Sequence, residues 1–395
     1  MKKIILSMSL LFILTACASV PDQVKSDMNG YRNAENGNLN NSEFTYINVS
    51  DLSDNAETAM SKEYGQFTIS NKIKFIQPSE LNIMSFKSVF GFSEKTEETV
   101  GLFFTASEIA AQNPDKNNLE FAFYNEIDKF YCNVDDDGFI AVLKPDAFDI
   151  SFSYSEPNVK IYHPDRNDDL NDEYQLNDGK CSVNDAVEYV DNWLETKYEP
   201  LCPDFNCKVN TVIVREHNNN YLYQFLAESS YKGVPIDSYT REAEIVDGEH
   251  TGKMSYIDYG IQIQMINIDT IDSFTNLMGM IEPTVIENID ECISLESALN
   301  FCENTFTDFR DVTISDIDIM YTLNPVYETD DEGNLFVSGY NSCPVWEFII
   351  DVPPEDFLVD GETNTYGDTR KYIYIDMVTG ELKYNLDIVK QELGG

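Results

Sequence analysis

Histidine is scarce in this sequence, and so are the motifs on which most enzyme classes depend. The three histidines are His163, His217 and His250, and no two of them have the spacing of metal ligands on a helix or a hairpin. A zinc enzyme or a histidine-dependent hydrolase therefore has few candidate residues. The chain also lacks a nucleophile elbow, a phosphate-binding loop, a zinc-binding helix motif and a dinucleotide-binding glycine pattern. We expect no catalytic residues, no cofactor and no metal site.

Basic residues are also few. The chain has 26 Lys and Arg against 70 Asp and Glu, and its formal net charge is -44. Such a surface is repelled by nucleic acid phosphates and by anionic lipid headgroups, so we expect no nucleic acid partner. The acidic surplus could attract divalent cations, basic peptides or basic polymers. The simpler interpretation is that it keeps the protein soluble.

The one long apolar run near the start is Ile4–Leu14, which is shorter than the roughly 20 residues that span a bilayer. Lys2 and Lys3 precede it and two small residues follow it, so residues 1–16 are predicted to be a signal peptide. Leu14-Thr15-Ala16-Cys17 resembles the bacterial lipobox, whose cysteine receives a diacylglyceryl group and becomes the first residue of the mature protein. The alternative is an ordinary signal peptide beside an incidental cysteine. The resemblance implies an extracytoplasmic protein anchored to the bacterial membrane by lipid on Cys17, and loss of Lys2 and Lys3 would change the net charge to -46.

Composition divides the rest of the chain. Residues 17–43 are rich in Asn, Gly, Asp and Ser and poor in apolar residues, which predicts a flexible stalk. The 24 Phe and 23 Tyr of the whole chain require packed domains beyond it. Apolar alternation in "FTISNKIKFI" and "LEFAFYNEI", with a short helix in "ETVGLFFTASEIAAQ", predicts a separate α+β domain over residues 44–165.

Two later segments resemble each other. Ser182 and Ser294 are suitable helix N-caps, each followed by an acid in the first turn. Apolar residues then recur with helical spacing, at Val183, Val187, Val190, Leu194 and Tyr198 and at Leu295, Leu299, Cys302, Phe306 and Phe309. Each helix is followed by alternating strands, and we pair "KVNTVIVRE" with "DVTISDIDIMY", Leu222–Leu226 with Val345–Ile349, and Lys253–Asp258 with Lys371–Asp376.

The predicted fold class is therefore α+β. It comprises tandem modules, each of one helix packed on a small antiparallel sheet, and the additional N-terminal α+β domain. The predicted boundaries place the modules at residues 166–280 and 281–395. Chance similarity of short apolar segments is the alternative explanation of the repeat.

Two stretches carry a family resemblance. The final hairpin, with Asp376 followed by Thr379-Gly380-Glu381, resembles that of PepSY-type and related cystatin-like modules of bacterial envelope proteins. Ser229–Ile236, with its "GVPI", is similar to a stretch of membrane-tethered regulators of a Gram-positive cell-wall histidine kinase. The first copy departs from the pattern because Asp258 is not followed by Thr-Gly-Glu. The resemblance implies binding, inhibition or regulation, and it supplies no catalytic residues.

Seven cysteines remain besides Cys17, an odd number that cannot all pair within one chain. Cys202 and Cys207 are the best local candidates for a disulfide, because the four residues between them allow a turn. Cys302, on an apolar helix face, is predicted to be a core residue.

Two acidic segments are candidate cation sites. Asn133, Asp135, Asp137 and Gly138 match the start of a calcium loop, but Lys144 occupies the position of its bidentate glutamate. A solvated hairpin turn is favoured there, and an exposed linker is favoured for Asp165–Glu173.

The function that we expect is that of a lipid-anchored extracytoplasmic binding or regulatory lipoprotein. Its partner would be an envelope protein, a basic peptide or a wall polymer. The alternative is a carboxylate-dependent hydrolase of a cell-wall polymer, which requires two buried acids with raised pKa values in a cleft. The aromatic strands Tyr221–Phe225 and Val345–Phe348 are expected to be core, with a partner groove as the alternative.

Overall fold

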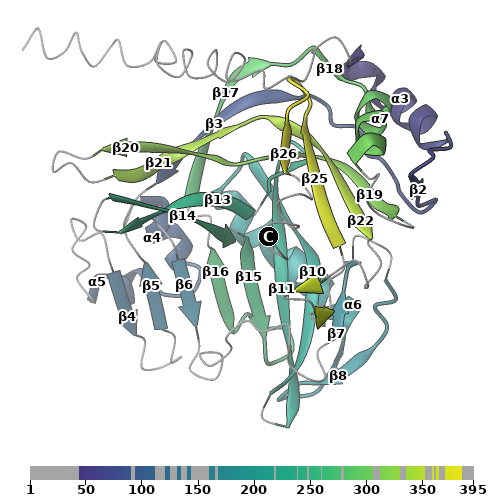
Figure 1. Ribbon diagram of the computed structural model, residues 1–395. Helices are drawn as coiled ribbons and strands as arrows, with labels where there is room; N and C mark the ends of the chain where they lie inside the picture. The colour runs from purple at the N-terminus through teal and green to yellow at the C-terminus, as the bar shows by residue number, and fades with distance from the viewer. Residues whose placement is uncertain are drawn as a thin grey trace, which may run out of the picture.

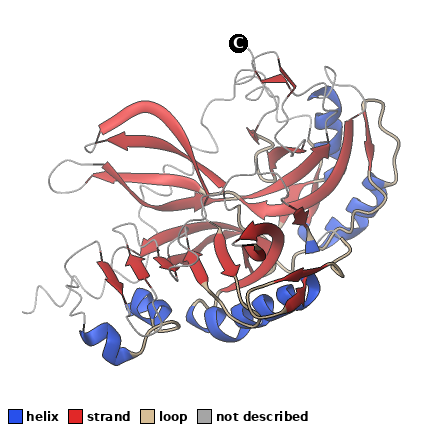
Figure 2. Ribbon diagram, turned by 90° about the horizontal axis from the view of Figure 1, so that it is seen from below, coloured by secondary structure: helices blue, strands red, loops and turns tan. Residues whose placement is uncertain are grey.

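The fold consists of two large, mainly antiparallel sheets, each covered by helix on one face, with smaller sheets around them (Figure 1). The computed structural model describes residues 44–89, 94–111, 121–124, 131–134, 140–143, 160–164, 168–217, 219–237, 239–246, 249–258, 260–276, 280–305, 312–329, 335–351, 358–359, 362–363 and 370–384. The chain is α+β, as predicted. The helices lie at the margins of the molecule, outside the sheets (Figure 2).

The larger sheet is antiparallel throughout. Its strand order is β4 (Phe121–Tyr124), β5 (Tyr131–Val134), β6 (Ile140–Leu143), β16 (Ser273–Asn276), β15 (Ile261–Met265), β11 (Asn220–Tyr231), β10 (Phe205–His217) and β7 (Lys160–Tyr162), with β12 (Val234–Pro235) paired to β11. The predicted hairpin around residue 137 is confirmed in its two strands, β5 and β6, while residues 135–139 and Lys144 lie outside the described residues.

Helix α6 (Val183–Trp193) packs on the part of this sheet that runs from β7 to β16. It begins where the sequence predicts, because the Ser182 hydroxyl accepts a hydrogen bond from the Asp185 N–H at 3.0 Å. The α-helix ends at Trp193, and the chain continues as the π-turn η4 (Leu194–Tyr198) and the 3-10 turn η5 (Glu199–Leu201). All five predicted apolar residues of this segment are buried. They pack on Val212, Val214, Tyr223, Phe225 and Ile263 of the sheet to form the first core.

The second main sheet has the order β2 (Phe67–Ile69), β19 (Val312–Tyr321), β22 (Pro344–Asp351), β25 (Arg370–Asp376) and β26 (Leu382–Tyr384). All its pairings are antiparallel except β2 with β19. Helix α7 (Leu295–Thr305) and helix α3 (Leu52–Met60) lie side by side on it and form the second core with Trp346, Phe348 and Ile373 (Figure 1). Of the predicted face of α7, Leu295, Leu299 and Cys302 are buried, and Phe306 and Phe309 lie outside the described residues.

The remaining strands form smaller sheets. Four strands make the sheet β17 (Met280–Asn288), β3 (Asn82–Val89), β21 (Leu335–Ser342) and β20 (Asn324–Thr329). The two-stranded sheets are β1 (Tyr46–Asn48) with β18 (Glu291–Ile293), β8 (Glu173–Gln175) with β9 (Lys180–Ser182), β13 (Tyr239–Val246) with β14 (Glu249–Asp258), and β23 (Leu358–Val359) with β24 (Glu362–Thr363). The other short helices are η1 (Val49–Asp51), α4 (Glu94–Val100) and α5 (Ala106–Ala111).

The same order of elements follows α6 and α7. Four consecutive neighbours, β10-β11-β15-β16, follow the first helix, and β19-β22-β25-β26 follow the second. Two of the predicted strand correspondences, β10 with β19 and β11 with β22, occupy equivalent positions. The third is wrong, because Lys253–Asp258 lies in β14, whereas Lys371–Asp376 lies in β25, whose positional equivalent is β15. A short alternation of apolar residues does not specify which strand it pairs with. Here, the hairpin β13–β14 is inserted along the chain between β11 and β15.

The prediction of a separate domain over residues 44–165 is contradicted by the strand pairings. Strands β1, β2 and β3 pair with β18, β19 and β17, all of which come from residues after 279. Strands β6 and β7 instead join the larger sheet, beside β16 and β10. The reason is that sheet pairing is non-local, so strands that are near in sequence are shared between two distant partners.

Candidate functional site

The turn between β11 and β12 carries the end of the larger sheet into the second core. Lys232 and Gly233 both have positive φ, 50° and 83°, as the two central residues of a tight hairpin turn require. The Lys232 ammonium pairs with the Glu80 carboxylate at 2.5 Å. This turn lies within Ser229–Ile236, one of the two stretches that carry the family resemblance.

The side chains around this turn are buried against residues of the second core. Tyr231, Val234 and Ile236 belong to that core, and the Tyr231 ring lies 6.4 Å from the ring of Tyr321, between centroids. Ile236 forms a parallel bridge with Tyr321, and the Asp237 N–H donates to the Tyr321 carbonyl at 2.8 Å. The β12 segment therefore connects the two main sheets through side chains and backbone.

Tyr321 also contacts a third element, strand β3. Its hydroxyl accepts a hydrogen bond from the Asn82 N–H, at the start of β3, at 3.1 Å. Burial raises the pKa of Tyr321 to about 12. The hydroxyl is therefore neutral at physiological pH and serves as a fixed acceptor.

Carboxylates gather at the same place, and we call Glu228, Asp237, Asp318, Glu347 and Tyr374 together the acidic junction. Asp318, Glu347 and Tyr374 are register partners on β19, β22 and β25, so they share one face of the second sheet, opposite the core side chains Trp346 and Phe348. Glu228 and Asp237 flank Ser229–Ile236, the segment of the larger sheet that reaches the second core. The Ile236 N–H donates a hydrogen bond to the Ser229 carbonyl at 2.8 Å and so joins the two ends of this segment. Four acids from two sheets thus meet across the contact.

Glu347 is a buried carboxyl group of this junction. Only 6% of its surface is exposed, and burial raises the pKa of its carboxyl well above the usual range. The charges of Asp318, Asp237 and Glu228 raise this pKa further, and a hydrogen bond with Tyr374 lowers it in part. Burial and the neighbouring acids together favour the protonated, neutral form, so the arrangement can hold a proton between the two sheets.

Two other buried acids have a different environment. The Asp272 carboxylate accepts hydrogen bonds from the Ile266 N–H at 2.8 Å and the Asn267 N–H at 3.1 Å. The Asp376 carboxylate accepts from the Val378 N–H at 2.8 Å and the Thr379 N–H at 2.9 Å. Each side chain accepts hydrogen bonds from two successive backbone N–H groups, so we interpret both residues as structural caps of turns.

The resemblance in the last hairpin is consequently explained by local structure. Gly380 has φ +74°, as expected for this turn, and a Cβ atom there would lie 2.4 Å from Cε2 of Phe44. Positive φ and close approach both require glycine. The Cys343 thiol also donates to Asp376, at 3.0 Å.

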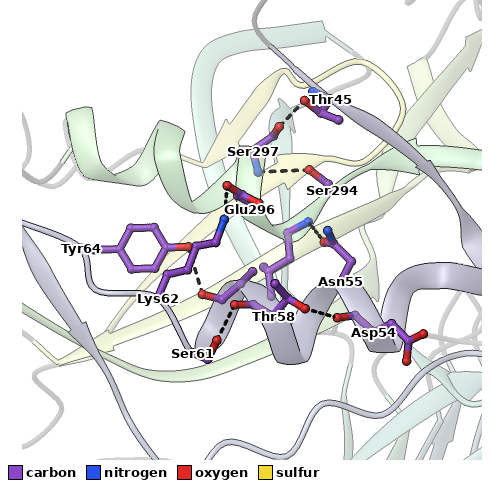
Figure 3. Close-up of polar contacts among 12 residues, drawn as sticks. Thr45, Asp54, Asn55, Thr58, Ser61, Lys62, Tyr64, Ser294, Glu296 and Ser297 are labelled. Carbon is purple, nitrogen blue, oxygen red and sulfur yellow. Dashed lines mark hydrogen bonds and ion pairs between the residues drawn. The ribbon is translucent and has the colours of Figure 1, made fainter.

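The start of the described chain is attached to helix α7, which the sequence did not indicate. The Thr45 N–H donates to the Ser297 hydroxyl and the Leu295 N–H donates to Asn55 Oδ1, both at 2.9 Å (Figure 3). Lys62 forms an ion pair with Glu296 beside them. Asn55 was not recognised because its partner lies 240 residues away.

The predicted site residues have different outcomes. Cys17 lies outside the described residues. Cys202 and Cys207 are both thiols in the structure, and the disulfide between them stays a prediction. Cys207 is held in β10 opposite Ser229, with its Sγ 3.6 Å from the Ser229 hydroxyl, and its side chain is buried in the first core, where burial raises its pKa to about 12. The strand, which begins at Phe205, thus directs this thiol into the core.

The acidic segment before the first helix is involved in local hydrogen bonds where it is described. Residues 165–167 lie outside the described residues, while Asp168 accepts from the His163 N–H at 2.7 Å and Asp172 from the Tyr162 hydroxyl at 2.6 Å. Across the described part of the chain, no three His, Cys, Asp or Glu side chains are arranged to hold a metal ion.

The aromatic strands belong to the cores. Tyr223, Phe225, Trp346 and Phe348 are all fully buried, so the core interpretation is confirmed for these side chains. Within the described ranges, no helix has both the length and the apolar character needed to cross a membrane. Comparison of the chain with protein-family models, curated proteins and solved structures gave no match.

Proposed function

We propose that this protein is a lipid-anchored extracytoplasmic binding or regulatory protein of the bacterial envelope. The observation that carries the proposal is Cys17, placed directly after a basic segment, the apolar run Ile4–Leu14 and two small residues. Two acyl chains on its sulfur would anchor a body that its negative charge keeps away from anionic headgroups.

The tandem-module interpretation belongs to the same proposal. The order of one helix followed by four antiparallel neighbours, after both α6 and α7, supports two PepSY-like modules. Such modules in envelope proteins imply binding, inhibition or regulation. A surface with this acidic excess favours an envelope protein with a basic patch, a basic peptide or a cationic wall polymer, and disfavours nucleic acid.

The point where the stalk joins the body suggests which half is nearer the membrane. Residues 17–43 lead to Phe44, and the chain then pairs through β1 with β18, beside α7. A flexible linker of this length has a root-mean-square span of about 30 Å. In the anchored protein, this linker would therefore connect the membrane to the sheet under α7. The larger sheet would be attached to the membrane only through that sheet.

Membrane fractionation tests the anchor. In the native host, we expect the wild-type protein in the membrane fraction, with a diacylglyceryl adduct on an N-terminal Cys17 by mass spectrometry. Cys17→Ala should move the protein to the soluble extracytoplasmic fraction, while the matched control Cys202→Ala should remain in the membrane. A wild-type protein that retains residues 1–16, or carries no lipid adduct, contradicts the proposal.

Cross-linking in intact envelopes tests the partner. We expect wild-type protein to capture a discrete envelope partner or a basic polymer, and the capture to weaken with added salt, as interactions between exposed charges do. Recovery of uncross-linked protein alone under all salt conditions would contradict a binding role.

One observation favours the alternative, a carboxylate-dependent hydrolase. Glu347 is an acid with a raised pKa beside ionisable acids, which is the pattern of a general acid with a carboxylate partner. Its carboxyl is buried at the contact between sheets, however, and a substrate must reach a catalytic group. Turnover of purified wall polymer by the wild-type body, abolished by Glu347→Gln, would establish the hydrolase and overturn the binding proposal.

A further inference from the structure

The segment from Tyr231 to Asp237 is part of the contact between the two main sheets. Tyr231, Val234 and Ile236 enter the second core, and the backbone is joined by the bridge between Ile236 and Tyr321 and by the hydrogen bond of Asp237 to the Tyr321 carbonyl. The acidic junction lies at this contact, since Asp237 is next to the bridge and Asp318 is on the same strand as Tyr321. A charge change there acts on both sheets at once.

We propose that the protonation state of Glu347 controls how firmly the β12 segment is held against β19, so that the acidic junction makes the contact between the two sheets sensitive to external pH. The proposal concerns the folded body and does not depend on the lipid anchor. In the tight state, Glu347 carries its proton and is neutral. When the proton passes to water, Glu347 becomes a buried anion.

The groups that face Glu347 determine the direction of the effect. Asp318 is beside it on β19, Glu228 is on β11 and Asp237 follows β12, and each raises its pKa when ionised. Tyr374 on β25 is the neighbour whose hydrogen bond favours the ionised form. Ionisation of Glu347 therefore adds a negative charge between acids of both sheets and repels the β12 segment.

Amide hydrogen exchange measures this contact directly. We would follow residues 231–237 and 312–321 from about pH 5 to about pH 9, after correction for intrinsic exchange rates, with helix α6 as an internal reference. In the wild-type body we expect exchange in the two contact segments to accelerate about 10-fold as pH rises, which corresponds to one pK unit of coupling. Exchange in α6 should stay constant.

Substitutions separate the proposal from a general effect of pH. Glu347→Gln, which keeps the size of the side chain, should make exchange in the contact segments independent of pH in this range. The matched control Glu328→Gln, at an exposed glutamate of β20, should behave as wild type. If Glu347→Gln retains the wild-type pH dependence, the proposal is wrong.

Two further variants keep the test decisive if Glu347→Gln does not fold. Tyr374→Phe removes the hydrogen bond that favours ionisation, so the transition should move to higher pH. Glu228→Gln removes a negative charge, so the transition should move to lower pH. Shifts in the same direction, or acceleration of α6 together with the contact segments, would refute a local proton-controlled contact.

Discussion

The second strand of each helix-and-sheet unit carries a polar side chain at the same place, Gln224 in β11 and Glu347 in β22. Both lie between two fully buried aromatic residues that face the helix, and both are themselves buried, with 1% and 6% of their surface exposed. The two side chains have nearly the same shape and differ in whether they can ionise. In the larger sheet, the side chain at this position cannot ionise. In the second sheet, it is a carboxyl group whose ionisation the neighbouring acids make unfavourable.

The environments of the two positions also differ. Gln224 is the register partner of Ile213 and Gln264, so its neighbours across the sheet are uncharged. Glu347 lies between Asp318 and Tyr374. A buried amide is neutral at every pH, whereas a buried carboxyl group among acids destabilises the fold further at every pH at which it is ionised.

The largest effect is expected from the two tryptophans, one in each unit. Trp346 is fully buried and its indole N–H donates to the Ile293 carbonyl at 2.8 Å, whereas Trp193 is only partly buried against the first core. Trp346→Ala should lower the free energy of unfolding by about 3 to 5 kcal/mol. Trp193→Ala should cost clearly less, and urea titration of both variants measures the difference. Equal losses would mean that the two cores contribute equally at these positions.

Placing the ionisable group in the other sheet should produce the next largest effect. Gln224→Glu buries a carboxyl in the larger sheet and should lower the free energy of unfolding at about pH 8 by about 2 to 4 kcal/mol. The loss should shrink toward about pH 4, where the new carboxyl is protonated. Urea titrations at both pH values test this. Gln224→Met is the control, because a loss that does not depend on pH reflects packing.

The reciprocal change should stabilise the protein. Because the folded state holds the Glu347 proton at pH values where the unfolded chain has released it, the free energy of unfolding falls as pH rises above the usual value of 4.5. Glu347→Gln removes this dependence and should raise the free energy of unfolding by about 1 to 3 kcal/mol at about pH 8, with the gain disappearing near pH 4. Thermal unfolding across this range measures it. A gain that is the same at every pH would contradict the assignment of a raised pKa.

The smallest expected difference concerns the two helix starts. The Ser182 hydroxyl caps α6 through the Asp185 N–H at 3.0 Å, and the Ser294 hydroxyl accepts from the Ser297 N–H at 3.2 Å. Ser182→Ala should cost about 1 kcal/mol. Ser294→Ala should cost less, because Asn55 satisfies the Leu295 N–H at the same helix end. In chemical unfolding, the double variant Ser294→Ala with Asn55→Ala should lose more than the sum of its single variants, and strict additivity would exclude shared capping.

Much of the local structure could be predicted from the sequence. The helix starts at Ser182 and Ser294 and the burial of Cys302 follow from capping and periodicity, which involve residues within one or two turns. The predicted single helix around Phe103 is instead two short helices, α4 and α5, and "FTISNKIKFI" contributes only β2. Such boundaries depend on what packs against the segment.

The candidate site could not be predicted in the same way. In "PVWEFIID" the glutamate alternates with Trp346 and Phe348, so the pattern is equally typical of a solvent-facing residue. The approach of β12 to β19 is a tertiary contact, and it brings Glu228 and Asp237 toward that face. Likewise, the spacing of Cys202 and Cys207 does not indicate that Cys207 is buried in the first core, against which Cys202 also packs.

By itself, the sequence determined the α+β class, the two capped helices and the strands β10, β11, β19 and β22, because hydrogen bonds and apolar periodicity within a segment act over short distances along the chain. The tertiary structure alone decided that residues 44–89 join the second core and that Glu347 is enclosed by acids of two sheets. Strand partners and the electrostatic environment of a side chain depend on residues that can lie hundreds of positions apart, and their proximity exists only once the chain has folded.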